Sequence, residues 1–119
     1  PKLAGDGMAD EQVYCAEAGG VEGEQKAAMD KFRADYKAKF GMDVQVYAPY
    51  VYDAVNVMVK AMQNANSADP AKYLPALKSI SYKGVTGQIE FDEKGDIKNG
   101  ALTLYTYKGG QRSEIAVIR

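Results

Sequence analysis

The segment of residues 49–64 most constrains the fold, because it is apolar on most sides of the helix that it predicts. Its valines would also suit a strand, but the length of the segment favours a helix. A helix of this kind needs more than one neighbour to cover it. The other elements of the 119 residues are few and short, so we expect further polypeptide or a second copy of the chain to complete the cover.

Two more helices are predicted, one on each side of this segment. Residues 24–40 carry apolar side chains at helical spacing with charged residues between them, and Gly41 suits a left-handed C-terminal cap. Later in the chain, Asp69 can cap a helix whose first position is Pro70. Pro75 lies inside that helix, so we expect a kink or a restart there.

Strand signals lie in five segments that separate and follow the helices, and apolar and polar residues alternate in two of them, residues 43–47 and 87–91. The five segments are residues 12–16, 43–47, 87–91, 101–107 and 113–118. A turn is expected at residues 92–96, and Gly109-Gly110 predicts a hairpin between the last two strands. The interleaving of strands and helices predicts the α/β fold class.

Composition excludes several classes of function. The chain holds 15 Lys+Arg and 16 Asp+Glu, and a net charge of −1 gives no reason to expect nucleic acid or an anionic membrane as partner. With no His and one Cys, we predict no metal site, no cofactor and no disulfide framework. Cys15 lies in an apolar strand, where a small buried residue is a better interpretation than a nucleophile. We therefore expect no enzyme activity.

Gly5-Asp6-Gly7 is the most informative short motif, because it follows an apolar strand start. Its carboxylate would lie at the carboxyl end of that strand, where open α/β sheets bind ligands. The flanking glycines allow close backbone approach, and the carboxylate of Asp6 can accept hydrogen bonds from an ammonium or guanidinium group. A plain surface turn uses the same residue types, so the motif alone leaves both interpretations open.

Two other motifs have structural interpretations. Residues 92–96 do not fit a calcium loop, because Lys94 occupies a ligand position and Gly95 comes too early. The tyrosines at positions 47, 50 and 52 most simply serve packing, although one of them could line a pocket.

Several longer motifs together resemble a known family. They are residues 32–41, 46–54, 82–87, 91–96 and the closing hairpin of residues 104–110. These motifs are similar to the leucine/isoleucine/valine-binding family of periplasmic solute-binding proteins, and the similarity covers nearly the whole chain. The resemblance implies the C-terminal third or so of a two-lobed, type I receptor, with strands and helices from both lobes. The chain opens at Pro1 without an initiator Met, which also suggests a fragment or a processed product.

The resemblance implies a division of the chain. Residues 1–20 would end a segment of the C-terminal-side lobe and carry the ligand loop. Residues 21–91 would form a helix–strand–helix part of the other lobe, and residues 92–119 the return crossover and the C-terminal hairpin. Such receptors bind a small amino acid in the cleft between their lobes and deliver it to the membrane permease of an ABC transporter. A periplasmic location, after removal of a signal peptide, is implied as well.

For the site, the resemblance matches Asp6 to the acidic residue that binds the ligand's α-ammonium group. It matches Tyr47 to the aromatic residue that the other lobe sends toward the ligand's side chain. The family usually has a longer stretch with a helix after the Gly-Asp-Gly loop, whereas only residues 8–11 separate Gly7 from Gln12 here. An alternative also stays open, in which the chain is a small α/β interaction or dimerisation module, dimeric or swapped, without a ligand.

Overall fold

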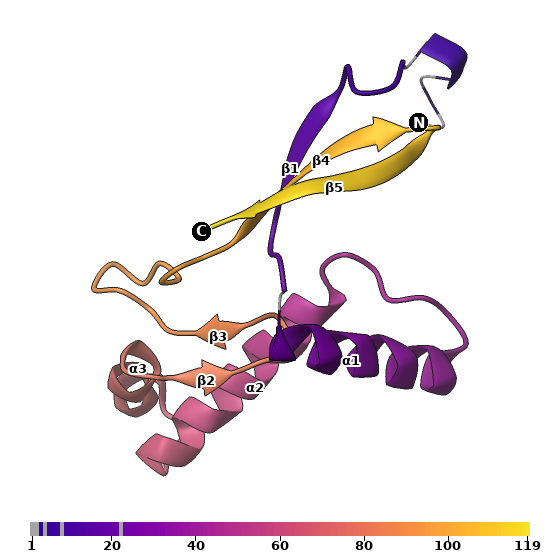
Figure 1. Cartoon of the computed structure of the whole chain (residues 1–119). Helices are drawn as coiled ribbons and strands as arrows, with labels where there is room; N and C mark the ends of the chain where they lie inside the picture. Colours follow the sequence, from indigo (N-terminus) through magenta and orange to yellow (C-terminus); the bar gives the residue numbers. More distant parts are fainter. Residues whose placement is uncertain (1–2, 4, 8, 22) are drawn as a thin grey trace. The chain divides into compact units, whose positions relative to one another are not determined.

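The computed structural model describes residues 3, 5–7, 9–21 and 23–119, and the chain divides into two compact units. Unit 1 comprises Pro1–Gly20 and Asn99–Arg119, and unit 2 comprises Val21–Lys98. The chain therefore passes from unit 1 into unit 2 and back again, as the colours in Figure 1 show. Helices and strands are both present, which agrees with the predicted α/β class.

Unit 1 is built on a three-stranded antiparallel sheet with the order β1-β4-β5 (Figure 1). A short 3-10 helix, η1, precedes the sheet. The elements are η1 (Gly5–Gly7), β1 (Tyr14–Ala18), β4 (Leu102–Lys108) and β5 (Gln111–Ile118). The predicted hairpin is confirmed, and the predicted first strand begins two residues later than expected.

Three features of the sequence allow this sheet to form. Gly109 and Gly110 both have positive φ, 55° and 72°, which is the backbone that a tight two-residue hairpin requires. Thr103 is a buried β-branched residue in the central strand β4, and its Oγ1 donates a hydrogen bond to the Gly19 carbonyl at 2.7 Å. A Cβ on Gly20 would lie 2.7 Å from a methyl group of Val117, so only glycine fits there.

Unit 2 is built on three helices and a small two-stranded sheet. The elements are α1 (Glu24–Phe40), α2 (Ala48–Ala65), α3 (Pro70–Lys78), β2 (Tyr82–Lys83) and β3 (Gln88–Ile89). The core consists of one stripe of α2, Val57 and Ala61, packed with Ile80 and Ile89. Because these four positions come from α2, β3 and the segment between α3 and β2, one core joins these three parts of the unit.

The three predicted helices are confirmed: α1 and α2 match their predicted ends to within about a residue, and α3 begins at Pro70 as predicted. Gly41 has φ 70° and its N–H donates to the Lys37 carbonyl at 2.9 Å, as expected of a left-handed cap. Asp69 accepts a hydrogen bond from the Ala71 N–H at 3.0 Å. The structure contains no restart at Pro75. Helix α3 runs continuously through this residue, and Leu77, two residues later, packs on the unit 2 core.

The predicted strand at residues 43–47 is wrong. Residues 43–45 have no regular structure, and residues 46–47 form a turn that leads into α2. A strand needs a neighbour to complete its hydrogen bonds, and none of the described strands pairs with this segment. The alternating pattern of residues 43–47 is therefore left without a sheet among the residues that the structure describes.

The prediction for residues 87–91 is only partly correct, because the strand shortens to β3 and Phe91 forms an isolated bridge with Ile97. The turn at 92–96 is confirmed: one carboxylate oxygen of Asp92 accepts hydrogen bonds from the N–H groups of Lys94 and Asp96, both at 2.9 Å. Cys15 lies in β1 and is half-buried rather than buried. Among the described helices, none combines the length and apolar character needed to cross a bilayer.

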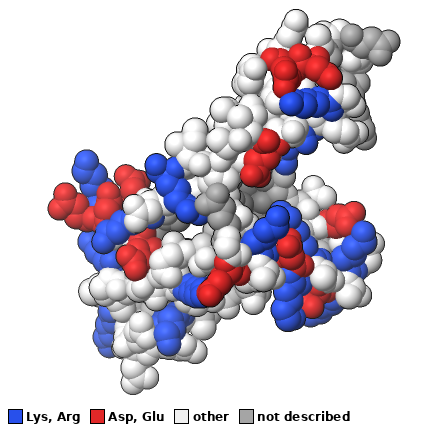
Figure 2. Space-filling view, viewed as in Figure 1, with Lys and Arg blue, Asp and Glu red and all other residues white. Residues whose placement is uncertain are grey.

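Charges of both signs are mixed on the surface. Figure 2 shows Lys and Arg side chains interspersed with Asp and Glu on the face that it displays. Within α1, Lys31 pairs with Asp35 at 2.5 Å. Lys37, near the end of α1, pairs at 2.8 Å with Asp43 in the segment that follows the helix. All four side chains are exposed, so these pairs contribute little to stability and serve mainly to keep the helix surface solvated.

Candidate functional site

The predicted ligand loop, Gly5-Asp6-Gly7, forms the 3-10 helix η1 ahead of β1. Gly5 has φ 52°, a left-handed conformation that glycine adopts without strain. Among the described atoms, a Cβ added at Gly5 or Gly7 would meet none within 4 Å. The side chain of Asp6 lies outside what the structure describes, so its role as an anionic anchor stays a prediction.

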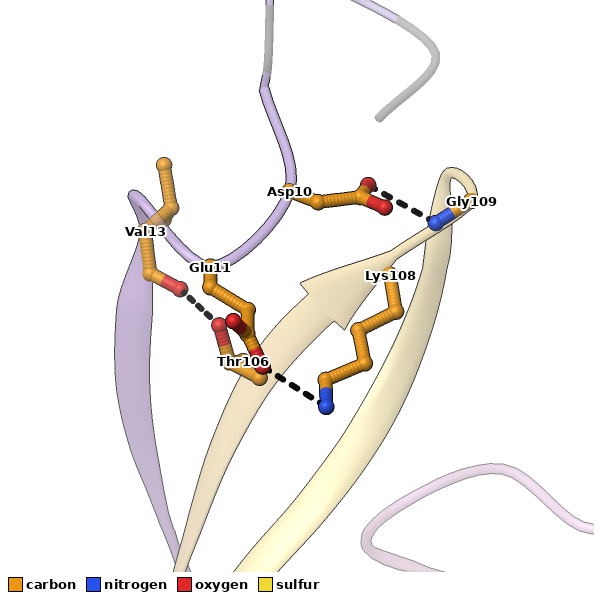
Figure 3. Close-up of polar contacts among 6 residues, drawn as sticks. All are labelled: Asp10, Glu11, Val13, Thr106, Lys108 and Gly109. Carbon is orange, nitrogen blue, oxygen red and sulfur yellow. Dashed lines mark hydrogen bonds and ion pairs between the residues drawn. The ribbon is translucent and has the colours of Figure 1, made fainter.

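The segment after η1 is fastened to the β4–β5 hairpin through backbone groups (Figure 3). The Asp10 carboxylate accepts a hydrogen bond from the Gly109 N–H at 2.8 Å. The Glu11 N–H donates to the Tyr107 carbonyl at 2.9 Å. Both contacts join residues about a hundred positions apart in the sequence, so they fix where the segment from η1 joins the sheet of unit 1.

Side chains strengthen the same attachment. The Glu11 carboxylate pairs with the Lys108 ammonium group at 2.6 Å, and Thr106 Oγ1 donates to the Val13 carbonyl at 3.0 Å (Figure 3). The hydrogen bond from Lys108 to Glu11, followed by their charge attraction, raises the pKa of Lys108 above its usual value of 10.5. Thr106 is buried, whereas Glu11 and Lys108 are more than half exposed.

The backbone of Glu11 has φ 61°, which non-glycine residues rarely adopt. This conformation costs about 1 kcal/mol or more and persists only where surrounding contacts hold it. Here the backbone N–H and the carboxylate of Glu11 both bind β4, at Tyr107 and Lys108. The strained residue therefore lies where the segment from η1 turns onto the sheet.

An open pocket of about 340 Å³ lies beside this attachment. Its walls come from the loop before β1 and from β1, β4 and β5. They are formed by Glu11, Tyr14, Thr106, Lys108, Ser113, Glu114 and Ile115. Two carboxylates, one ammonium group and three hydroxyl groups can hydrogen-bond a small polar molecule, although the ammonium group already has a carboxylate partner.

Another polar cluster on this sheet was not predicted from the sequence. Arg112 forms an ion pair with Glu17, and its guanidinium group stacks over the Tyr105 ring at 4.3 Å from the ring centre. The neighbouring Tyr107 has a raised pKa, mainly through its interaction with Cys15. In the strand predicted at residues 101–107, positions 105 and 107 share a face because side chains alternate between faces, but the pairing of β1 with β4 was needed to bring Glu17 and Cys15 onto that face.

The second predicted ligand residue, Tyr47, lies in unit 2, whereas Asp6 lies in unit 1. Tyr47 is the residue before the first turn of α2, and its carbonyl accepts a hydrogen bond from the Val51 N–H at 3.0 Å. Its side chain is 76% exposed. Of the two other tyrosines in this stretch, Tyr52 packs on Phe32 of α1, with ring centres 5.0 Å apart. Exposure leaves the Tyr47 ring available to a ligand, which is a property that its predicted role requires.

Asp53, on α2, is the most buried charged residue described, at 1% exposed, and sequence reasoning missed it. Its carboxylate accepts hydrogen bonds from the Val85 N–H at 3.0 Å, the Thr86 N–H at 2.7 Å and Thr86 Oγ1 at 2.6 Å. A Cβ on Gly84 would lie 2.3 Å from a carboxylate oxygen of Asp53, so glycine is required there. Burial and then the charge of Asp53 raise the pKa of Tyr82. Asp53 therefore anchors the β2–β3 turn on α2, and the only signal for it was an acid inside an apolar helix.

Comparison with known proteins identifies relatives of the chain. It is 36% identical over 91 residues to a leucine-, isoleucine-, valine-, threonine- and alanine-binding protein of Pseudomonas aeruginosa, a match that covers 76% of this chain and 23% of the relative. It is 28% identical over 117 residues to Leu/Ile/Val-binding protein homolog 1 of Brucella abortus, covering 91% of this chain and 32% of that protein. The chain thus spans between about a quarter and a third of the length of these relatives.

Solved structures have the same fold over nearly all of the chain. The leucine-binding protein LivK from Thermotoga maritima superposes with a TM-score of 0.72 at 26% identity, covering 98% of this chain and 33% of that one. The branched-chain amino acid transporter substrate-binding protein LivJ from Streptococcus pneumoniae superposes with a TM-score of 0.69 at 22% identity, covering 91% and 30%. These neighbours are two-lobed periplasmic binding proteins, which confirms the fold expected from the resemblance. A family model described as periplasmic binding protein matches residues 2–111, and the chain therefore belongs to the periplasmic binding protein family.

Proposed function

We propose that this chain is part of the periplasmic substrate-binding component of an ABC transporter, and that the ligand is a branched-chain amino acid or a related small amino acid. The observation that carries the proposal is the 36% identity over 91 residues to a protein named for binding leucine, isoleucine, valine, threonine and alanine. The superposition with a leucine-binding protein at a TM-score of 0.72 supports it. The transporter's membrane permease would be the protein partner.

In this proposal Asp6 and Tyr47 contact the ligand from different units. The carboxylate of Asp6 would accept charge-assisted hydrogen bonds from the α-ammonium group, and the Tyr47 ring would contact the apolar side chain of the ligand. Recognition of this kind makes and breaks no covalent bond. The proposed role is therefore binding and not catalysis.

The two places where the chain passes between the units, at residues 20–21 and 98–99, would act as the hinge of the receptor. Next to both crossings, Gly19 is tied to β4. Its N–H donates to the Ala101 carbonyl at 2.7 Å, and its carbonyl accepts from Thr103 Oγ1 at 2.7 Å. In this proposal one unit rotates against the other about the two crossings. Closure of a cleft around a ligand that stabilises the closed form requires such a rotation.

The test uses a chimera in which these 119 residues replace the segment of the Pseudomonas aeruginosa relative that is equivalent to them in the receptor fold. Titration calorimetry is expected to give saturable, one-to-one binding of leucine to the chimera. A chimera that folds but gives no heat of binding, while the parent relative binds leucine under the same conditions, would refute the proposed function.

The role of Asp6 is tested in the same chimera. Loss of one partner of a buried charge pair costs about 3–5 kcal/mol, so Asp6→Asn is expected to weaken leucine binding by roughly two to four decades. Asp30→Asn, on an exposed position of α1, is the matched control and should leave the affinity unchanged. Equal affinity of the two variants would remove Asp6 from the ligand site while leaving the binding function itself standing.

A further inference from the structure

Asn99 and Gly100 form a reactive dipeptide at the point where the chain returns from unit 2 to unit 1. Of the asparagines in the sequence, Asn99 alone precedes a glycine. Both residues are exposed, and Asn99 has φ 53°, a left-handed backbone of the kind that Asn-Gly pairs adopt in tight turns. An asparagine before a glycine can cyclise, because its side-chain amide carbon and the next backbone nitrogen can close a five-membered ring.

The dipeptide lies between two backbone positions that are held by hydrogen bonds. Before it, the Lys98 N–H donates to the Glu90 carbonyl at 3.0 Å within unit 2. After it, the Ala101 carbonyl accepts from the Gly19 N–H at 2.7 Å within unit 1. The Gly100 N–H itself has no hydrogen-bond acceptor in the part of the chain that the structure describes. The nitrogen that would attack the side chain is therefore not held by the fold.

Asn66 is a natural comparison, because it has the same kind of backbone. It has φ 48°, is exposed and precedes another small residue, Ser67. The Ser67 N–H, however, donates to the Met62 carbonyl at 3.0 Å, where α2 ends. Ring closure at Asn66 requires that hydrogen bond to break first, whereas no such bond opposes ring closure at Asn99. The two asparagines thus differ in the state of the nitrogen that follows each of them.

We propose that Asn99 is a site of spontaneous deamidation, which places an isoaspartate in the second crossing between the units. The Gly100 nitrogen attacks the Asn99 Cγ, so that an N–Cγ bond forms and the Cγ–Nδ2 bond breaks. The amide proton of Gly100 leaves with the side-chain nitrogen as ammonia. One water molecule then opens the succinimide ring, at the main-chain carbonyl to give isoaspartate or at Cγ to give aspartate. Water is the only co-reactant that this chemistry needs.

Isoaspartate changes the crossing in two ways. It adds one carboxylate, and hence one negative charge, beside the turn. It also carries the main chain through the side-chain carbons, so the chain becomes longer by one methylene group between Lys98 and Ala101. Because both of these positions are held by hydrogen bonds, the added length strains the neighbouring contacts. The hydrogen bond from Gly19 to Ala101 is the contact next to the change, and we expect it to weaken.

The experiment ages the 119-residue chain at neutral and at mildly alkaline pH and follows each asparagine by peptide mass spectrometry. Deamidation raises the mass of a peptide, and isoaspartyl and aspartyl peptides separate by chromatography. Each rate is divided by the rate of the same asparagine in concentrated urea, which removes the intrinsic difference between glycine and serine as the following residue. Gly100→Ala is the matched variant, because it keeps Asn99 and restricts the backbone of the attacking nitrogen.

Asn99 is expected to deamidate in buffer at nearly its rate in urea, and mainly to isoaspartate. Asn66 should react slower in buffer than in urea by roughly tenfold or more, because its nitrogen is available only when the end of α2 opens. Gly100→Ala should slow the reaction of Asn99 in buffer and in urea alike. The rate at Asn99 should rise with pH, since the attacking nitrogen must lose its proton.

Hydrogen exchange of the Gly19 N–H measures the effect on the crossing. The fresh chain, the aged chain and Asn99→Asp are compared, because Asn99→Asp carries the new charge on a main chain of ordinary length. Exchange at Gly19 should accelerate in the aged chain alone. Exchange at Gly84, whose N–H donates to the Gly87 carbonyl at 2.9 Å in unit 2, should stay unchanged in all three.

Four results would overturn the proposal. A rate at Asn99 far below its rate in urea would show that the fold protects it, and an Asn66 that reacts equally fast in buffer and in urea would show that the fold does not select between them. Unchanged exchange at Gly19 after ageing would remove the effect on the crossing, and an equal acceleration in Asn99→Asp would remove the role of the longer main chain. All readouts are taken without amino acid, so they are independent of the proposed function.

Discussion

Two aspartates in this chain each accept hydrogen bonds that hold a loop in place, but one is exposed and the other is buried. Asp10 in unit 1 accepts one backbone hydrogen bond from Gly109, and its side chain is exposed. Asp53 in unit 2 accepts two backbone hydrogen bonds and a hydroxyl hydrogen bond, and it is 1% exposed. Each carboxylate holds a loop onto an element distant in the sequence.

The difference in burial decides what each contact contributes. Water can replace the Asp10 carboxylate at the Gly109 N–H, so the loss of that hydrogen bond costs little. Water cannot reach the turn at Val85 and Thr86 as easily, and the donors there would be left without partners. The loop that carries the predicted ligand residue Asp6 is thus held by contacts that can be remade, whereas the β2–β3 turn is fixed.

The largest expected effect comes from Asp53→Ala. It removes the acceptor for three hydrogen bonds and leaves the N–H groups of Val85 and Thr86 unpaired, so we expect unit 2 to lose about 3–5 kcal/mol of unfolding free energy. Urea unfolding followed by circular dichroism of the helices measures it. Asp30→Ala, on the exposed surface of α1, should change stability by less than about 0.5 kcal/mol. Similar losses of unfolding free energy in the two variants would mean that burial does not determine how much a carboxylate contributes to stability.

The second-largest effect is expected from Gly84→Ala, which changes the β2–β3 turn directly beside the carboxylate of Asp53. The new Cβ would lie 2.3 Å from a carboxylate oxygen of Asp53, and that carboxylate cannot move away without losing its hydrogen bonds. We expect a cost of about 2 kcal/mol, typical of overpacking. In a double-mutant cycle with Asp53→Ala, the cost of Gly84→Ala should largely disappear. Strict additivity would show that the glycine is needed for another reason.

Much of unit 2 could be predicted from the sequence, because its helices are specified by local signals. Periodic apolar residues mark residues 24–40, and Asp69-Pro70 marks the start of α3 with a cap that the structure contains. The strand at residues 43–47 was predicted from an equally clear alternation and is wrong. Alternation describes what a strand would bury, but it cannot supply the neighbouring strand that its hydrogen bonds require.

The predictions that failed or were missing all depend on long-range pairing. β1 pairs with β4 across more than eighty positions, and only that pairing places Glu17 beside Arg112. Asp53 was missed for the same reason, since its partners lie more than thirty residues further along the chain. For the candidate site, the sequence supplied Asp6 and Tyr47 through family resemblance, but the contacts of Asp10 and Glu11 that position the loop came from the structure.

A smaller effect is expected from Asp10→Ala in unit 1. The variant removes the single hydrogen bond to the Gly109 N–H, which is at an exposed hairpin, so the cost should be about 0.5–1.5 kcal/mol. Amide exchange of Gly109 should accelerate, while exchange in the helices of unit 2 stays unchanged. An effect as large as that of Asp53→Ala would contradict the comparison, because it would show that water cannot replace the lost carboxylate.

The smallest effect concerns the exposed pair of Glu11 and Lys108. The pair raises the pKa of Lys108 above its usual 10.5, so its contribution to stability is fully present below that value and is lost as pH rises through the raised pKa. Glu11→Gln should return the pKa of Lys108 toward its usual value, which an NMR titration of the lysine methylene groups next to Nζ measures. Because both side chains are more than half exposed, stability near pH 7 should hardly change. A clear loss of stability there would mean that the charge of Glu11 supports its left-handed backbone, and the loop before β1 would then depend on that charge as the β2–β3 turn depends on Asp53.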